Sequence, residues 1–191
     1  MQYLGIEEVA KVLRAAYKEN RAHHLMLLLS FSHGLRRSEV AALRVRDVQD
    51  GRICVSRVKG SLRTEQPLMA SDNLLFDEPK SLAAWLDERV GDSDALFPSR
   101  KGHGTLKPDS VGKIAVHYME KANVPEKLAH HHSLRHACCS LLARAGVGIE
   151  YIAQYAGHKD IKNTRIYLHI SDNEASATAF AVFKSLLLLA A

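Results

Sequence analysis

Three short segments of the chain carry side chains that suit the chemistry of a phosphate group. The first reads Gly-Leu-Arg-Arg-Ser-Glu (residues 34–39), the second reads His-Ser-Leu-Arg-His (residues 132–136), and the third is Gly157-His158, with Tyr167 nine residues after the histidine. A guanidinium is always charged and presents a planar fork of donors that fits phosphate oxygens, and imidazole N–H groups also donate to such oxygens. The segments therefore indicate a site that binds phosphate and stabilises charge on it.

Each of these residue types also has an ordinary explanation. Arginines usually lie on the solvated surface, and Arg37 directly beside Arg36 illustrates how common they are. Tyr167 is one of six tyrosines and, by its type alone, fits a core or a surface position. Lys59 stands in Val-Lys-Gly, and a lysine before a glycine is common at hairpin tips. Order and spacing, not composition, select these residues.

In that order and spacing, the segments resemble the motifs of the tyrosine recombinases, the phage integrase family of enzymes that cut and rejoin DNA. The similarity continues through Leu-Phe-Pro-Ser-Arg (residues 96–100) and through Lys59, eight residues before Pro67, and covers nearly the whole chain. Residues 31–36 resemble the short recombinases of fimbrial phase variation. The resemblance implies site-specific recombination through a 3′-phosphotyrosyl intermediate, with no cofactor, metal or ATP.

The resemblance implies that Arg36 and Arg135 clamp the scissile phosphate and that Tyr167 is the nucleophile. Attack by a tyrosine would leave a covalent bond to DNA and a free 5′-hydroxyl, which splits one difficult displacement into two easier ones. A phenol has an ordinary pKa of about 10 and needs help to lose its proton at neutral pH. Neighbouring arginines and histidines could supply that help.

Four further residues receive supporting roles from the same resemblance. Lys59 would be the general acid that protonates the departing 5′-oxygen. His132 would act as a base or bind the phosphate, and His158 would donate to a non-bridging oxygen. Glu39, three residues after Arg36, would share a helical face with it and hold its guanidinium, although a plain surface pair is the alternative.

Other histidines and the cysteines are expected to be structural. Residues 130–132 are three histidines in a row, but consecutive side chains cannot all point at one ion, so no metal site is expected. His136 would lie along the helix that carries Arg135. Cys54, Cys138 and Cys139 are too few and too poorly spaced for a disulfide framework, and we expect reduced, buried thiols.

The pattern of apolar residues predicts a mostly α fold with one small antiparallel β-sheet (α+β), the catalytic-domain fold of these recombinases. Residues 52–69 read as a β-hairpin, and Pro67 confines its second strand to an edge. Apolar residues at helical spacing predict helices at residues 6–17, 21–33, 38–43, 80–89, 110–122, 133–145 and 149–155, with a final helix at about 172–189.

Length and charge point to one domain with a polyanionic partner. The 191 residues are 47% hydrophobic and carry a formal charge of +5, which favours nucleic acid. We expect one catalytic domain over residues 1–191, without the N-terminal core-binding domain of longer family members.

The expected partners of this domain are double-stranded DNA and further copies in a tetramer on paired sites, with the final helix packed in the same chain or on a neighbour. Neither a signal peptide nor a membrane span is evident, which favours the cytoplasm, on the bacterial nucleoid or encoded by a mobile element.

Two other functions fit part of the pattern. Residues 149–169 can be read as a helix-turn-helix of a non-catalytic DNA-binding protein, but that reading leaves Arg36, Lys59 and residues 132–135 without a purpose. A type IB topoisomerase would use the same nucleophile and clamp to relax supercoils without exchanging strands. Formation of paired complexes and Holliday junctions would distinguish a recombinase from it.

Overall fold

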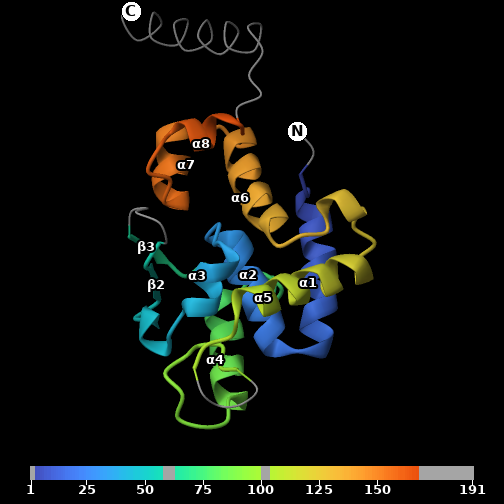
Figure 1. Ribbon diagram of the computed structural model, residues 1–191, viewed down its shortest axis with the longest axis vertical. Coiled ribbons are helices and arrows are strands. Elements are labelled where there is room, and N and C mark those ends of the chain that lie inside the picture. The colour runs from blue at the N-terminus through green and yellow to red at the C-terminus, as the bar shows by residue number, and fades with distance from the viewer. Residues whose placement is uncertain (1–2, 58–62, 100–103, 168–191) are drawn as a thin grey trace, which may run out of the picture.

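Helices dominate the computed structural model, which describes residues 3–57, 63–99 and 104–167. A small three-stranded antiparallel sheet lies beside them (Figure 1), so the fold class expected from the sequence is confirmed. In chain order the elements are α1 (Ile6–Glu19), α2 (Arg21–Ser32), α3 (Arg37–Ala42), η1 (Val45–Asp47), β1 (Val48–Gln49), β2 (Arg52–Val55), β3 (Thr64–Pro67), α4 (Glu78–Glu88), α5 (Pro108–Lys121), η2 (Glu126–Leu128), α6 (His132–Arg144), α7 (Ile149–Ala156) and α8 (Lys162–Arg165).

Local signals in the sequence start and stop these helices. The side chain of Asn20 accepts a hydrogen bond from the His23 N–H at 2.8 Å and so caps the start of α2. Asp77 caps α4 in the same way through the Lys80 N–H, at 2.9 Å. Gly34, just after α2, has φ of +56°, a left-handed conformation that favours glycine. This turn directs the chain toward Arg36, the residue just before α3.

The predicted hairpin is present and has a third strand beside it. In the sheet order β1-β2-β3, Val55 pairs with Thr64 and Ile53 pairs with both Val48 and Gln66. Pro67 ends an edge strand, as expected. The strands are shorter than predicted, and β1 was missed because two residues are too few to show alternation. The hairpin tip at residues 58–62, with Lys59, lies outside the described residues.

Two large apolar clusters and one small cluster hold the elements together. The first cluster joins α1, α2, α5 and α6, and the second joins α2 and α5 to α3, α4 and the sheet. Helix α2 serves both clusters, which is why its residues 24–31 are all buried. The small cluster lies between α6 and α7, which lie in the upper part of the coloured ribbon in Figure 1. The three phosphate-compatible segments are therefore carried by different parts of the core.

The predicted helices agree with the structure to within about two residues at most ends. Helices η1, η2 and α8 were not predicted, since each is a single turn with too little periodicity to detect. The final helix predicted at about 172–189 lies outside the described residues. Among the helices that the structure describes, none is long and apolar enough to cross a membrane.

Candidate active site

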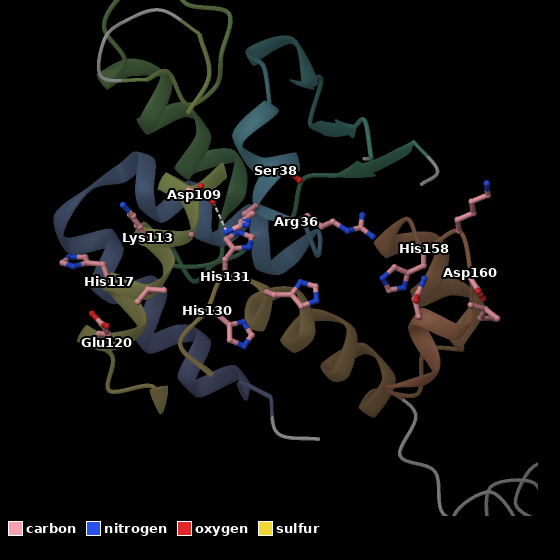
Figure 2. Close-up of a pocket in the computed structure, with 17 residues that line it drawn as sticks. Arg36, Ser38, Asp109, Lys113, His117, Glu120, His130, His131, His158 and Asp160 are labelled. Atoms are coloured by element: carbon pink, nitrogen blue, oxygen red, sulfur yellow. Dashed lines mark ion pairs between the residues drawn. The ribbon is translucent and has the colours of Figure 1, made fainter. Parts of the chain in front are cut away.

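A cavity of about 1540 Å³ opens between α3, α5, the start of α6 and the turn that follows α7. Arg36, His132 and His158, one from each of the three segments, all line it. Figure 2 shows Arg36 reaching from the start of α3 toward the turn that carries His158. Segments far apart in the sequence thus supply one wall of a single cavity.

Arg36 is held at the edge of this cavity by Glu39. The Arg36 N–H donates to Glu39 Oε2 at 2.8 Å, and Arg36 Nη1 donates to Oε1 at 2.7 Å. The Glu39 side chain is fully buried, whereas that of Arg36 is 31% exposed. The predicted contact is therefore present, and it is not a surface pair. The carboxylate fixes one end of the guanidinium, and the rest of it faces the cavity.

Glu39 stays charged although it is buried. Burial alone would raise the pKa of its carboxyl, but the hydrogen bond from the Arg36 N–H and the charges of Arg57 and Arg36 outweigh burial, so the pKa is lowered. The negative charge of Glu39 offsets part of the positive charge of the two arginines that pair with it, Arg36 and Arg57.

Arg135, predicted to clamp the phosphate, is buried beneath the cavity and does not line it. Its side chain leaves α6, is 1% exposed, and donates from Nη2 to the Ala156 carbonyl at 2.9 Å and from Nη1 to the Gly34 carbonyl. Burial, followed by the charge of Arg36, lowers its pKa. These bonds join the segment before Arg36 to the end of α7.

Arg57 belongs to the same cluster and was not predicted from the sequence. Its side chain is fully buried. It donates to Glu39 Oε2 at 3.0 Å, to Thr64 Oγ1 at 3.0 Å, to the His33 carbonyl at 3.2 Å and to the Tyr155 carbonyl at 3.0 Å. An arginine just after a strand reads as a solvated residue, and no spacing in the sequence marks it. Only the tertiary contacts reveal it.

The two predicted histidines are neutral at pH 7. Burial of the rings and the positive charges around them lower the pKa of both His132 and His158 to about 4. His158 is buried and shares a hydrogen bond with Thr164 Oγ1 at 2.8 Å through Nδ1. His132 is shielded from water by its neighbours on one side and open to the cavity on the other, and its ring lies edge-on to that of His136, with 4.4 Å between ring centroids. A neutral imidazole can donate to a phosphate oxygen or accept a proton.

Tyr167 lies behind this group and not in the cavity wall. It is 4% exposed and packs with Cys139, Ile152 and Ala156. Its ring meets His136 edge-on at 5.4 Å between centroids, so His136 lies between Tyr167 and His132. Burial, followed by the influence of Cys139, raises the pKa of its hydroxyl. The structure thus brings the predicted nucleophile close to the site but holds it protonated and covered.

Comparison with known proteins identifies the family. The model of the phage integrase family matches residues 2–174. The chain belongs to the phage integrase family. It is 32% identical over 175 residues to the type 1 fimbriae regulatory protein FimE of Escherichia coli (strain K12), covering 87% of this chain and 84% of that protein. It is 31% identical over 175 residues to the tyrosine recombinase XerD of Caulobacter vibrioides, covering 86% and 56%.

A solved structure agrees with this family. The crystal structure of the XerH site-specific recombinase bound to its difH substrate, a pre-cleavage complex, matches with a TM-score of 0.75 at 21% identity, over 94% of this chain and 54% of that one. At this identity the match shows the fold. Together with the family, it confirms the catalytic-domain fold that the sequence predicted.

Family and relatives identify the chain as a site-specific tyrosine recombinase. The topoisomerase and the non-catalytic DNA-binding protein are not favoured. The helix-turn-helix alternative also fits the geometry poorly, because α8 has only four residues, too few for a recognition helix in the major groove. In the part of the chain that the structure describes, no three His, Cys, Asp or Glu side chains are grouped closely enough to hold a metal ion.

Proposed function

We propose that this recombinase cuts and rejoins double-stranded DNA through a covalent bond between Tyr167 and a 3′-phosphate. The observation that carries the proposal is the convergence of Arg36, His132 and His158 on one cavity, with Arg135 directly beneath it. The formal charge of +5 and the XerH recombinase solved with its DNA substrate support DNA as the partner.

The arginines and histidines of the site would stabilise the phosphate as it reacts. Arg36 presents the exposed part of its guanidinium to a non-bridging oxygen, and Arg135 adds positive charge from beneath. Charge builds on these oxygens in the transition state, so donors fixed in advance lower the barrier. His158, neutral and held by Thr164, would donate a hydrogen bond to the same group.

Tyr167 would attack the phosphorus atom, forming the phosphotyrosyl bond while the bond to the 5′-oxygen breaks. A neutral imidazole at His132 can take the phenolic proton, and Lys59 would protonate the departing 5′-oxygen. Attack by a 5′-hydroxyl of another strand on the phosphotyrosyl bond reverses the step. The covalent bond conserves the energy of the broken linkage, so the reaction needs no ATP, and the arginines and histidines would stabilise the charge on the phosphate in place of a metal.

Exchange of strands requires two DNA sites to be held together. We propose that four copies assemble on paired sites, with the segment at about 172–189 packed on its own chain or on a neighbour. The place of action would be the DNA inside the cell, on the nucleoid or on a mobile element.

The test is covalent capture of the tyrosine on DNA. Purified protein is incubated in EDTA with supercoiled plasmid carrying the DNA that flanks its own gene, and the reaction is stopped with SDS. Wild type should give protein–DNA adducts, Tyr167→Phe should give none, and Tyr151→Phe, at an exposed tyrosine on α7, should match wild type. Adducts that persist in Tyr167→Phe, or DNA binding without adducts on nicked substrates and with longer forms of the protein, would contradict the proposal.

A further inference from the structure

Two buried arginines link the same two segments in parallel. Arg135 donates to the carbonyls of Gly34 and Ala156, and Arg57 donates to the carbonyls of the residues just before them, His33 and Tyr155. Two consecutive carbonyls after α2 and two at the end of α7 are thus held by two guanidinium groups. The motif resemblance accounts for Arg135 and leaves Arg57 without a role.

Arg57 also connects to the residue that faces the cavity. Its Nη1 donates to Glu39 Oε2 at 3.0 Å, the same oxygen that accepts the Arg36 N–H at 2.8 Å. On the other side it passes against Gly157, where a Cβ atom would lie 2.8 Å from Arg57 Cγ. Gly157 directly precedes His158, so one side chain touches the supports of both Arg36 and His158.

We propose that Arg57 is a positioning residue that fixes Arg36, through Glu39, relative to the turn that carries His158. It does not line the cavity, so it acts through other residues and not on the substrate. The inference rests on the proposed function, because the placement of Arg36 matters only if Arg36 contacts the scissile phosphate.

The geometry requires an arginine at this position. Arg57 serves four acceptors from three nitrogens: Thr64 Oγ1 from Nε, Glu39 from Nη1, and two carbonyls from Nη2. Lysine keeps the charge but concentrates its donors on one atom and cannot span these directions. Arg57→Lys is therefore a change that loosens the arrangement without removing the charge. Arg52→Lys is the matched control, since Arg52 lies on the adjoining strand β2 in an exposed pair with Glu65.

The experiment measures single-turnover adduct formation on saturating DNA and, separately, the dissociation constant by fluorescence anisotropy. We expect Arg57→Lys to slow adduct formation about 30-fold, as small misplacements of reacting groups do, while the dissociation constant changes less than about threefold. Arg52→Lys should match wild type in both. Equal rates for the two variants would overturn the inference, as would a loss of rate in Arg57→Lys matched by an equal loss of affinity.

A double variant separates positioning from general weakening. If Arg57 acts through Arg36, then adding Arg57→Lys to Arg36→Lys should slow the reaction by less than about threefold more. A full 30-fold further loss would overturn the inference while leaving the proposed function intact. Absence of adducts from wild type would instead count against the proposed function itself.

Folding of the variant is checked by thermal melting before the assay. Should Arg57→Lys be unfolded at the assay temperature, Thr64→Val replaces it, because it removes the hydrogen bond to Arg57 Nε and keeps the shape of the side chain. About a threefold slower adduct formation at unchanged DNA affinity would then support the inference. An unchanged rate would overturn it.

Discussion

The arginine cluster beneath the cavity and the surroundings of Tyr167 are built in opposite ways. Arg36, Arg57 and Arg135 are fixed by hydrogen bonds to a buried carboxylate and to backbone carbonyls. Tyr167 is packed among apolar side chains with the pKa of its hydroxyl raised. In the proposed mechanism, the difference means that the protein itself holds the phosphate-binding side chains in place, whereas attack requires Tyr167 to leave its cluster. Binding and cleavage should therefore be separable by mutation.

Tyr167→Phe is the sharpest test of this separation. It should reduce adduct formation below detection while the DNA dissociation constant stays within about twofold, because the hydroxyl does not line the cavity. Stability should change by less than about 1 kcal/mol, since a phenyl ring fits the same apolar cluster. Gel shifts and urea unfolding provide the two measurements. A large loss of affinity would mean that the tyrosine already takes part in binding.

Arg36 and Arg37 are neighbours in the sequence with different surroundings, and they form a matched pair. Arg36→Lys should slow adduct formation by about 10²- to 10³-fold, the usual effect of losing one preorganised donor. Arg37, whose side chain is 57% exposed and pairs with Asp109, should tolerate Arg37→Lys with a change of less than about threefold. The measurement is the single-turnover rate of adduct formation for each variant. An unchanged rate in both variants would indicate that charge at the cavity matters more than fixed geometry, because lysine keeps the charge of each residue.

Glu39→Gln tests whether the cluster depends on its buried carboxylate. Removing this charge leaves Arg57 buried without its counterion, and we expect a loss of about 3 kcal/mol in the free energy of unfolding, measured with urea. Asp94→Asn is the control, because its partly exposed pair with Arg44 should be worth less than about 1 kcal/mol. A similar small loss in both variants would show that the cluster does not need the anion.

The pH dependence of stability probes the histidines around the cavity. Burial, with neighbouring positive charge, lowers the pKa of both His131 and His158 to about 4, below the unfolded value of about 6.5. The unfolded state therefore binds more protons between these values, and stability falls as the pH drops from 7 to 5. Each group should contribute on the order of 2 kcal/mol to that fall.

Substitution of each histidine tests which side chain causes the fall in stability at low pH. His158→Gln should be unable to titrate and should show a shallower fall between pH 7 and 5 in urea unfolding, as should His131→Gln. The carboxyl of Glu39 affects stability at lower pH than the histidines do. Because its pKa is lowered in the folded protein, its stabilising contribution is lost only as the pH falls below about 4.5. An unchanged slope in both histidine variants would contradict the assignment.

The sequence predicted the parts of this molecule that repeat a pattern. Helices with a clear apolar stripe, the hairpin, and the contact between Arg36 and Glu39 followed from periodicity and spacing. Arg57 could not be found in this way, because its partners are His33 O, Tyr155 O and two side chains that meet only in the folded chain.

The burial of Tyr167 could not be predicted from the sequence either. Its spacing from His158 marked it as a candidate nucleophile, but spacing carries no information about burial. Tyr167 follows α8 and lies in the small cluster with Cys139 of α6, so this cysteine is a neighbour of the hydroxyl as well as a buried residue. His136 lies on α6 as expected, and its ring also contacts those of His132 and Tyr167.

The paired arginine links bear on the order of events during synthesis of the protein. Arg135 bonds to a carbonyl 101 residues earlier, and Arg57 bonds to one 98 residues later. Contacts that close such long loops form only when most of the chain is available. A nascent chain that ends before Tyr155 lacks acceptors of both arginines, so the cluster can be completed only late in synthesis. The proposed DNA-binding cluster and the proposed catalytic residues would thus become complete at the same late stage of synthesis.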